Sequence, residues 1–234
     1  MCVALSIIIP AYSEEGYIKD CIQHIRTAMA GYSYEIIVVD NGSLDNTIGV
    51  LRDVPPDMLL FEPLKGVVRA RQRGLDHASG HFVAFIDADA RMPMGWWQAA
   101  RQHFHDAKVA AVSGALQFYD GSHVLNQLAA RFYTVAQLLH RHWPTLQGGN
   151  CVIRRTALVD GLDVEYNFWG EDTAMAKTVA KHGTIVLDSH LVMFTSARRL
   201  NRAGTMRTVG MYVLNYLSVS LLGRPTTKQY QDYR

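Results

Sequence analysis

Acidic and aromatic residues follow three apolar runs in the first part of the sequence. Asp40 comes directly after EIIVV, the triplet Asp87-Ala88-Asp89 comes after FVAFI, and the run ALSIII ends in PAY at 10–12. Two carboxylates at positions i and i+2 after a buried strand can both face one oxygen-rich site. Hard cations such as Mg²⁺ and Mn²⁺ prefer carboxylates that they share with substrate phosphates. The pattern therefore predicts a nucleotide pocket with a divalent cation beside Asp87 and Asp89.

The same acidic residues have structural alternatives. Asp40 and Asp45 lie in DNGSLDNT, a stretch whose composition is typical of a loop. In such loops Asp stabilises turns and caps helices without any ligand, and Asp45 is a candidate N-cap. Asp172 follows Gly170 at the start of a predicted helix, where a short polar side chain also serves as an ordinary N-terminal residue. From residue types alone, both interpretations stay open.

Positive charge gathers near the C-terminus, although the formal net charge of the whole chain is only +2. No acidic residue lies between His190 and Gln231. This asymmetry predicts an anionic partner, with phosphates and lipid headgroups as the candidates, whereas the near-neutral total gives no reason to expect nucleic acid. The planar guanidinium group of arginine matches the geometry of phosphate oxygens. Arg198 and Arg199 therefore either bind a diphosphate or belong to a solvated basic loop. The basic residues of this segment are Arg198, Arg199, Arg202, Arg207, Arg224 and Lys228.

The segments that must position these groups alternate between strand and helix. Alternation of this kind predicts a doubly wound, mostly parallel α/β sheet with helices on both faces and ligands beyond the carboxyl ends of the strands. A chain of 234 residues fits one such domain. Strands are predicted at 4–9, 35–39, 58–61, 81–86, 109–113, 184–187 and 191–195, an extended segment at 145–153, and helices at 15–29, 45–52, 66–78, 95–105, 124–140, 171–181 and 209–222.

The cysteines and the apolar segments indicate where in the cell the protein is expected. Cys2, Cys21 and Cys151 are widely spaced without a CxxC pattern, so we expect neither a disulfide framework nor a zinc site, and a reducing cytoplasm fits. The N-terminus lacks a basic region before its apolar run, which indicates a first strand rather than a signal peptide. The sequence contains no run of 18 apolar residues, so we predict no membrane span. We therefore expect a cytoplasmic protein, with the inner face of the cell membrane as the alternative location.

Six segments resemble, in order, the motifs of family 2 glycosyltransferases with the GT-A fold. They are SIIIPAYSEE, EIIVVDNGSLDNT, GVVRARQRGLDHASG, FIDADARMP, GGNCVIRR and FWGEDTAMAKTVAKHG. The resemblance covers nearly the whole chain and is specific for the family. It implies inverting transfer of a sugar from a UDP- or GDP-sugar to a hydroxyl of a saccharide or lipid-linked acceptor, with Mg²⁺ or Mn²⁺. Two departures, Asn41 for a second Asp and Gln72 for Asn, leave the nucleotide open.

The resemblance also implies roles for single residues. Asp89 is expected to coordinate the metal, Asp172 to act as the general base, and Trp169 and Glu171 to contact the acceptor. The chain would comprise a GT-A domain at 1–200, with a nucleotide half at about 1–92 and an acceptor half at about 93–200, and a C-terminal helical extension at 201–234. The residues expected at the nucleotide sugar are Pro10, Ala11, Tyr12, Glu14, Asp40, Arg71, Asp87, Ala88, Arg198 and Arg199.

Several alternatives remain at this stage. A nucleotidylyltransferase normally has a glycine-rich, basic loop directly after the first strand. The segment PAYSEE contains neither glycine nor a basic residue, which disfavours this alternative. An inactive nucleotide-sugar-binding module is disfavoured because Asp40, Asp89 and Asp172 are all present. His190 is either a third metal ligand or a structural residue. The apolar stretch at 203–224, flanked by arginines, could contact an anionic membrane, pack over the sheet or form a homodimer.

Overall fold

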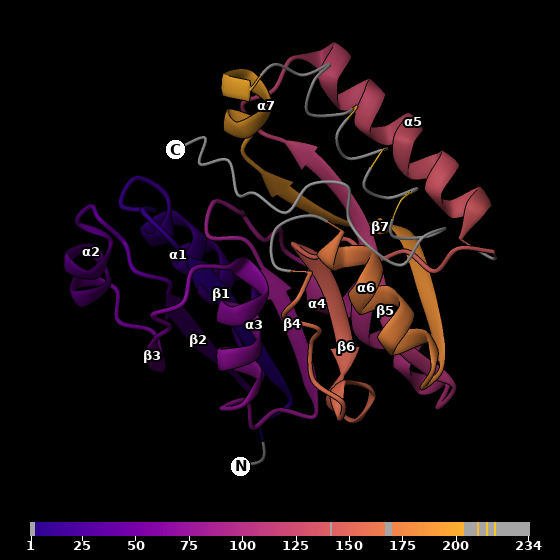
Figure 1. The fold of residues 1–234 in the computed structure, drawn as a ribbon, viewed down its shortest axis with the longest axis horizontal. Coiled ribbons are helices and arrows are strands. Elements are labelled where there is room, and N and C mark those ends of the chain that lie inside the picture. The colour runs from indigo at the N-terminus through magenta and orange to yellow at the C-terminus, as the bar shows by residue number, and fades with distance from the viewer. Residues whose placement is uncertain are drawn as a thin grey trace.

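One seven-stranded sheet organises the protein, with helices on both faces (Figure 1). This computed structural model describes residues 3–140, 142–166 and 170–203, together with 210, 214 and 218. The strand order is β3-β2-β1-β4-β6-β5-β7. The strands are β1 (Leu5–Ala11), β2 (Tyr34–Asp40), β3 (Met58–Phe61), β4 (Phe82–Ile86), β5 (Val109–Phe118), β6 (Asn150–Arg154) and β7 (Thr184–Thr195).

The helices connect these strands much as the sequence predicts. Short 3-10 turns follow α4 and β6, at Gln102–His105 and Arg155–Leu158. The predicted doubly wound, mostly parallel α/β fold is therefore confirmed for the described residues. The helices are α1 (Ile18–Ala28), α2 (Thr47–Asp53), α3 (Val67–Leu75), α4 (Trp96–Arg101), α5 (His123–Leu139), α6 (Glu171–Ala180) and α7 (Arg198–Ala203).

The central strands are buried on both faces because their sequences are continuous apolar runs. In β1, Ile7 and Ile9 belong to the core cluster that also contains Ile22 of α1. Ile8, between them, belongs to the cluster on the other face, which also contains Ala70 of α3. Successive side chains of a strand point to opposite faces, so one apolar run supplies both clusters. The sheet is thereby fixed between two helical layers, with its carboxyl edge left free to carry a site.

Strand β6 departs from the parallel arrangement. It runs antiparallel to both β4 and β5. Its register pairs Asn150 with Ile86, the last residue of β4. The start of β6 therefore lies beside the end of β4, where Asp87 follows. This insertion brings the GGN segment at 148–150 to the same edge of the sheet as the acidic triplet.

Three local predictions differ from the structure. The strands predicted at 184–187 and 191–195 are one strand, β7, with an irregular register opposite Gly114 of β5, and the polar residues that suggested a break lie in that irregularity. Strand β5 continues to Phe118 instead of ending at Ser113. The N-cap of α2 is Asn46, one residue after the predicted Asp45. Asp45 Oδ1 nevertheless accepts a hydrogen bond of 3.0 Å from the Thr47 N–H.

The predicted C-terminal helix at 209–222 lies mostly outside the described residues, as does Trp169. Gly210, Leu214 and Ser218 are described, and each is helical. Within the described part of the chain, no helix is both long and apolar enough to span a membrane. The division between a domain at 1–200 and an extension at 201–234 therefore stays a prediction.

Candidate functional site

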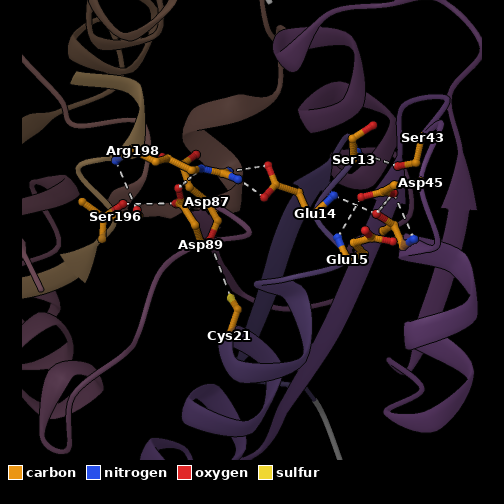
Figure 2. A network of polar contacts seen from close by, with 12 residues as sticks. Ser13, Glu14, Glu15, Cys21, Ser43, Asp45, Asp87, Asp89, Ser196 and Arg198 are labelled. Carbon is orange, nitrogen blue, oxygen red and sulfur yellow. Dashed lines mark hydrogen bonds and ion pairs between the residues drawn. The ribbon is translucent and has the colours of Figure 1, made fainter. Parts of the chain in front are cut away.

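The carboxyl ends of β1, β2 and β4 bring the predicted donor residues to one edge of the sheet. The register of β1 and β2 places Ala11 opposite Asp40. Strand β4 pairs with the other side of β1, so the triplet at 87–89 emerges next to the loop that follows β1. Figure 2 shows Glu14 of that loop and Asp89 on either side of Arg198, which comes from the far end of the chain. Residues predicted separately from the sequence thus converge.

Hydrogen bonds between side chains and backbone connect the loops after β1 and β2. Asp40 accepts from the backbone N–H groups of Gly42 and Ser43 at 3.2–3.4 Å, which is the turn-forming role left open by the sequence. The Glu14 N–H donates to the Thr47 hydroxyl at 2.7 Å, and the Glu15 N–H donates to Asp45 at 3.0 Å. Asp40 and Asp45 therefore both stabilise loop backbone. Contact of Asp40 with the nucleotide base stays a prediction.

Asn41 has a role that the sequence did not reveal. Its side-chain amide donates to the carbonyl oxygens of Glu62 and Leu64 at 2.8 and 2.9 Å. Its Oδ1 accepts from the Gly66 N–H at 2.7 Å. A carboxylate at this position would accept but could not donate to the two carbonyls. The amide therefore fixes the loop before α3, and this accounts for Asn in place of the Asp usual in the resembled motif.

Arg198 joins two carboxylates that are far apart in sequence. Its Nη2 donates to both Glu14 oxygens at 2.7 and 2.6 Å, and its Nε donates to Asp89 Oδ2 at 3.0 Å. The Glu14 side chain is 2% exposed and that of Asp89 is 12% exposed. Burial lowers the pKa of Arg198, but the two carboxylates raise it more, and the net pKa lies above its ordinary value. The guanidinium is therefore a fixed positive charge on the predicted metal ligand.

The segment that delivers Arg198 is itself anchored. Asp120 accepts from the Ser196 hydroxyl at 2.5 Å and from the Ala197 N–H at 2.6 Å. The Thr195 hydroxyl, at the end of β7, donates to Asp89 Oδ1 at 3.1 Å. Both oxygens of Asp89 thus have partners at the end of β7 or the start of α7. Sequence reasoning missed Asp120, because nothing near it in the chain marks it as a site residue.

Arg71 of α3 joins two further carboxylates. Its Nη2 lies 3.5 Å from Asp87 Oδ1, and its Nη1 lies 3.6 Å from Asp172 Oδ1. Its side chain is 4% exposed, whereas Asp87 and Asp172 are 46% and 36% exposed. The sequence predicted Arg71 at the nucleotide or its phosphates. The structure places its guanidinium between the donor-side carboxylate and the predicted base.

Two glycines let the chain approach these carboxylates. A Cβ on Gly148 would lie 2.0 Å from Asp172 Oδ1, and a Cβ on Gly149 would lie 2.3 Å from Asp87 Oδ2. Neither distance is compatible with any larger residue unless the site shifts. The GGN segment, predicted only as an acceptor-side strand, is thus a close-packed wall of the site.

The acidic pair at the start of α6 is electrostatically perturbed. Burial raises the pKa of the Asp172 carboxyl, and the Arg71 guanidinium lowers it only in part, so that the net shift is upward. Burial, and then the charge of Asp172, raise the pKa of Glu171 to about 8. Arg199, which is exposed at the start of α7, lowers the pKa of Glu171 by a smaller amount. The surroundings therefore favour the protonated form of Glu171 and make the Asp172 carboxylate more basic than an exposed one.

The carboxylates present fit a divalent cation shared with a ligand. Among the described residues, no three His, Cys, Asp or Glu side chains form a cluster that could hold a metal by themselves. Mg²⁺ is often bound through one or two carboxylates plus substrate phosphates, and Asp87 and Asp89 supply such a pair. The Arg198 guanidinium already shows that Asp89 accepts a cation. His190, predicted as an alternative third ligand, bonds instead to Asp188 Oδ1 through Nδ1 at 3.1 Å.

The remaining predicted residues have varied surroundings. The Lys65 ammonium lies 3.8 Å from the centre of the Tyr12 ring and also contacts its hydroxyl. Lys65, which was not predicted from the sequence, therefore places a positive charge beside the predicted base pocket. Pro10, Ala11 and Ala88 contribute backbone at the same edge of the sheet. Trp96 and Trp97 of α4 are core residues with 2% and 5% exposure.

The family is shown by comparison with known proteins. The model of the family described as glycosyl transferase family 2 matches residues 6–162, well over half of the chain. The glycosyltransferase AglE of Haloferax volcanii is 30% identical over 120 residues. That match covers 49% of this chain and 40% of AglE, so the chain spans less than half the length of this curated relative.

Solved structures share the fold. The mannosyltransferase PcManGT from Pyrobaculum calidifontis, in complex with GDP-Man and Mn²⁺, superposes with a TM-score of 0.75 at 22% identity, over 96% of this chain and 66% of that one. Glucosyl-3-phosphoglycerate synthase from Mycobacterium tuberculosis, in complex with Mn²⁺, UDP and glucosyl-3-phosphoglycerate, gives a TM-score of 0.68 at 22% identity, over 96% and 82%. At these identities the likeness concerns the fold, whereas the family match rests on sequence. The chain therefore belongs to glycosyl transferase family 2.

Proposed function

We propose that the protein transfers a sugar from a nucleoside-diphosphate sugar to an acceptor hydroxyl, with inversion at the anomeric carbon. The observation that carries the proposal is the bridge made by Arg71 between Asp87, on the donor side, and Asp172, at the start of α6. A transferase of this kind needs a cation-binding carboxylate and a basic carboxylate on opposite sides of one reacting carbon. The family match and the nucleotide complexes of the structural neighbours support the same assignment.

On the donor side, Asp89 and Asp87 would hold Mg²⁺ or Mn²⁺. When bound, such a cation neutralises the charge that grows on a departing diphosphate. Arg198 would add a second positive charge there, since its planar fork matches phosphate oxygens as well as carboxylates. Its present partners, Glu14 and Asp89, keep the guanidinium in place before a ligand arrives.

On the acceptor side, Asp172 would remove the proton of the attacking hydroxyl. Partial desolvation makes its carboxylate more basic, while Arg71 keeps the ionised form accessible near neutral pH. Glu171, protonated at neutral pH, could donate a hydrogen bond to an acceptor oxygen. Direct attack assisted by one carboxylate accounts for inversion. Saccharides and lipid-linked saccharides are the acceptor classes that we propose, in a protein located at or near the cytoplasmic face of a membrane.

The test is a panel of UDP- and GDP-sugars, assayed with Mn²⁺ or Mg²⁺ for release of the nucleoside diphosphate in the presence of saccharide acceptors. We expect release with at least one donor, loss of release with EDTA, and loss of metal-dependent donor binding in Asp89→Ala. The anomeric configuration of the product, determined by NMR, checks inversion. Donor binding without turnover would favour an inactive binding module, and pyrophosphate release from a nucleoside triphosphate would favour a nucleotidylyltransferase.

A further inference from the structure

Helix α5 has few buried side chains and makes several polar contacts with the sheet. Of its 17 residues, Leu125 and Tyr133 are the buried ones. The Tyr133 hydroxyl donates to a backbone carbonyl of β5 at 3.2 Å, and the Gln137 amide donates to a backbone carbonyl of β7 at 3.2 Å. Asn126 pairs with both the N–H and the carbonyl of the last residue of β5 at 2.7 and 3.0 Å. The face of α5 turned to the protein is therefore narrow and combines apolar and polar side chains.

The opposite face of α5 is apolar and exposed, which reverses the usual arrangement of a surface helix. At about 100° per residue, its large apolar side chains fall within an arc of roughly 120°, opposite Asn126, Tyr133 and Gln137, and buried Leu125 borders one edge of this arc. Contiguous exposed apolar patches mark interaction sites in soluble proteins. The patch, with its exposed fractions, consists of Val124 (64%), Leu128 (50%), Phe132 (46%), Val135 (51%), Leu138 (74%) and Leu139 (37%).

The charge around this patch has one sign. Arg131 is exposed and falls within the same arc as the apolar side chains. No Asp or Glu occurs between residues 121 and 159, which include the whole of α5. Figure 1 shows α5 along the β5–β7 end of the molecule, far from α2 and β3. The patch is thus an apolar surface with a positive centre and no acidic residue of its own helix.

The charge distribution discriminates among the candidates that could cover this patch. Two copies of α5 placed face to face would oppose two Arg131 side chains without a carboxylate on either helix. The segment at 204–231 of this chain also contains no acidic residue, so it offers no counter-charge either. An anionic lipid surface offers both an apolar layer for the side chains and negative headgroups for the arginine.

We propose that α5 docks the protein on anionic membranes, lying in the plane of the interface with its apolar patch in the headgroup–acyl boundary. The contact is peripheral, and it is distinct from the contact predicted for 203–224. It does not depend on the proposed reaction, because vesicle binding needs neither donor nor acceptor. Each large side chain withdrawn from the lipid should weaken binding about tenfold or more, the scale of burying one such side chain. Added salt should also weaken binding.

The experiment is flotation of the full chain with phosphatidylcholine vesicles, with and without phosphatidylglycerol. The native chain should float with the anionic vesicles, and the double variant Leu128→Glu/Phe132→Glu should stay in the soluble fraction. The double variant Phe61→Glu/Val159→Glu is the matched control, since it adds the same charge at side chains 59% and 72% exposed outside α5. Arg131→Glu, which leaves the apolar patch intact, should reduce flotation with anionic vesicles.

Any of four results would overturn the proposal. The first is that the native chain stays soluble with both vesicle types at low salt, and the second is that the double variant Leu128→Glu/Phe132→Glu floats as well as the native chain. A native dimer that dissociates in the double variant without any vesicle binding would assign the patch to a second copy. A large drop in the melting temperature of that variant, again without vesicle binding by the native chain, would assign the patch to contacts within this chain.

Discussion

Removing the Arg198 guanidinium should leave a buried carboxylate without its bidentate partner. In Arg198→Met the side chain keeps much of its length but loses the bonds to both Glu14 oxygens and to Asp89. Glu14 is 2% exposed, so water cannot readily replace what the guanidinium supplied. The variant should therefore be less stable than the native protein, before any ligand is considered.

The magnitude follows from the exposure of the partners. Breaking a fully buried ion pair by removing one partner costs about 3–5 kcal/mol. The Arg198 side chain is 18% exposed and that of Asp89 is 12% exposed, so we expect a cost at or just below the lower end of that range, about 2–3 kcal/mol. For a chain of this size, 1 kcal/mol corresponds to about 2–4 °C in the melting temperature. We expect Arg198→Met to melt about 4–12 °C below the native protein.

The decisive comparison is the double variant Glu14→Gln/Arg198→Met. It removes the negative charge of Glu14 along with the guanidinium that faces it, and we expect it to regain at least half of the lost stability. Urea unfolding followed by circular dichroism measures all three proteins. Arg91→Met is the control, because the Arg91–Asp20 pair is 39% and 54% exposed and should contribute less than about 1 kcal/mol. If Arg198→Met is as stable as the native chain, or if Glu14→Gln restores nothing, the buried pair is not what holds α7 to the site.

Three further predictions test other parts of the site. Gly148→Ala should destabilise the protein by about 1–3 kcal/mol and reduce turnover, because its Cβ would lie 2.0 Å from Asp172 Oδ1. The control Gly16→Ala should change stability little, because nothing lies within 4 Å of its Cβ. Equal unfolding curves for the two variants would refute the close packing at Gly148. The pKa of Glu171 is raised to about 8, so the folded state holds a proton that the unfolded state releases, and stability should fall as the pH rises from about 4.5 through about 8. The free energy of unfolding, measured across that range, should depend less on pH in Glu171→Gln than in the native chain. An unchanged pH dependence in this variant would contradict the burial of Glu171. Asn41→Asp should cost about 1–3 kcal/mol in thermal or urea unfolding, because it leaves two loop carbonyls without their donor; native stability in this variant would show that the amide is dispensable.

Features set by local pattern were predictable from the sequence. Continuous apolar runs located β1, β2 and β4, and the carboxyl-edge rule for parallel sheets then placed Asp40 and the triplet at 87–89 together. The helix that begins at Glu171 was likewise visible from its spacing and from the GED motif. Each of these predictions needed only residues close to one another in the chain.

Features set by long-range packing were not predictable. The Arg198–Glu14 contact joins residues 184 positions apart, and no local pattern pairs them. The Arg71–Asp172 contact joins α3 to the start of α6, 101 positions later in the chain, and the antiparallel insertion of β6 brings the 148–150 segment to the end of β4 beside them. The polar residues near Asp188 suggested a break between two strands, because a register irregularity and a loop share the same composition.

The most direct test of glycosyl transfer compares turnover and donor affinity in Asp172→Asn, with the donor identified from the nucleotide-sugar panel. We expect release of the nucleoside diphosphate to slow by about 10²- to 10⁴-fold, because the attacking hydroxyl loses its base. The dissociation constant of the donor, measured by calorimetry with Mn²⁺, should change little, since we propose that Asp172 acts on the acceptor. Native turnover in this variant, or no release from any UDP- or GDP-sugar by the native chain, would contradict the account.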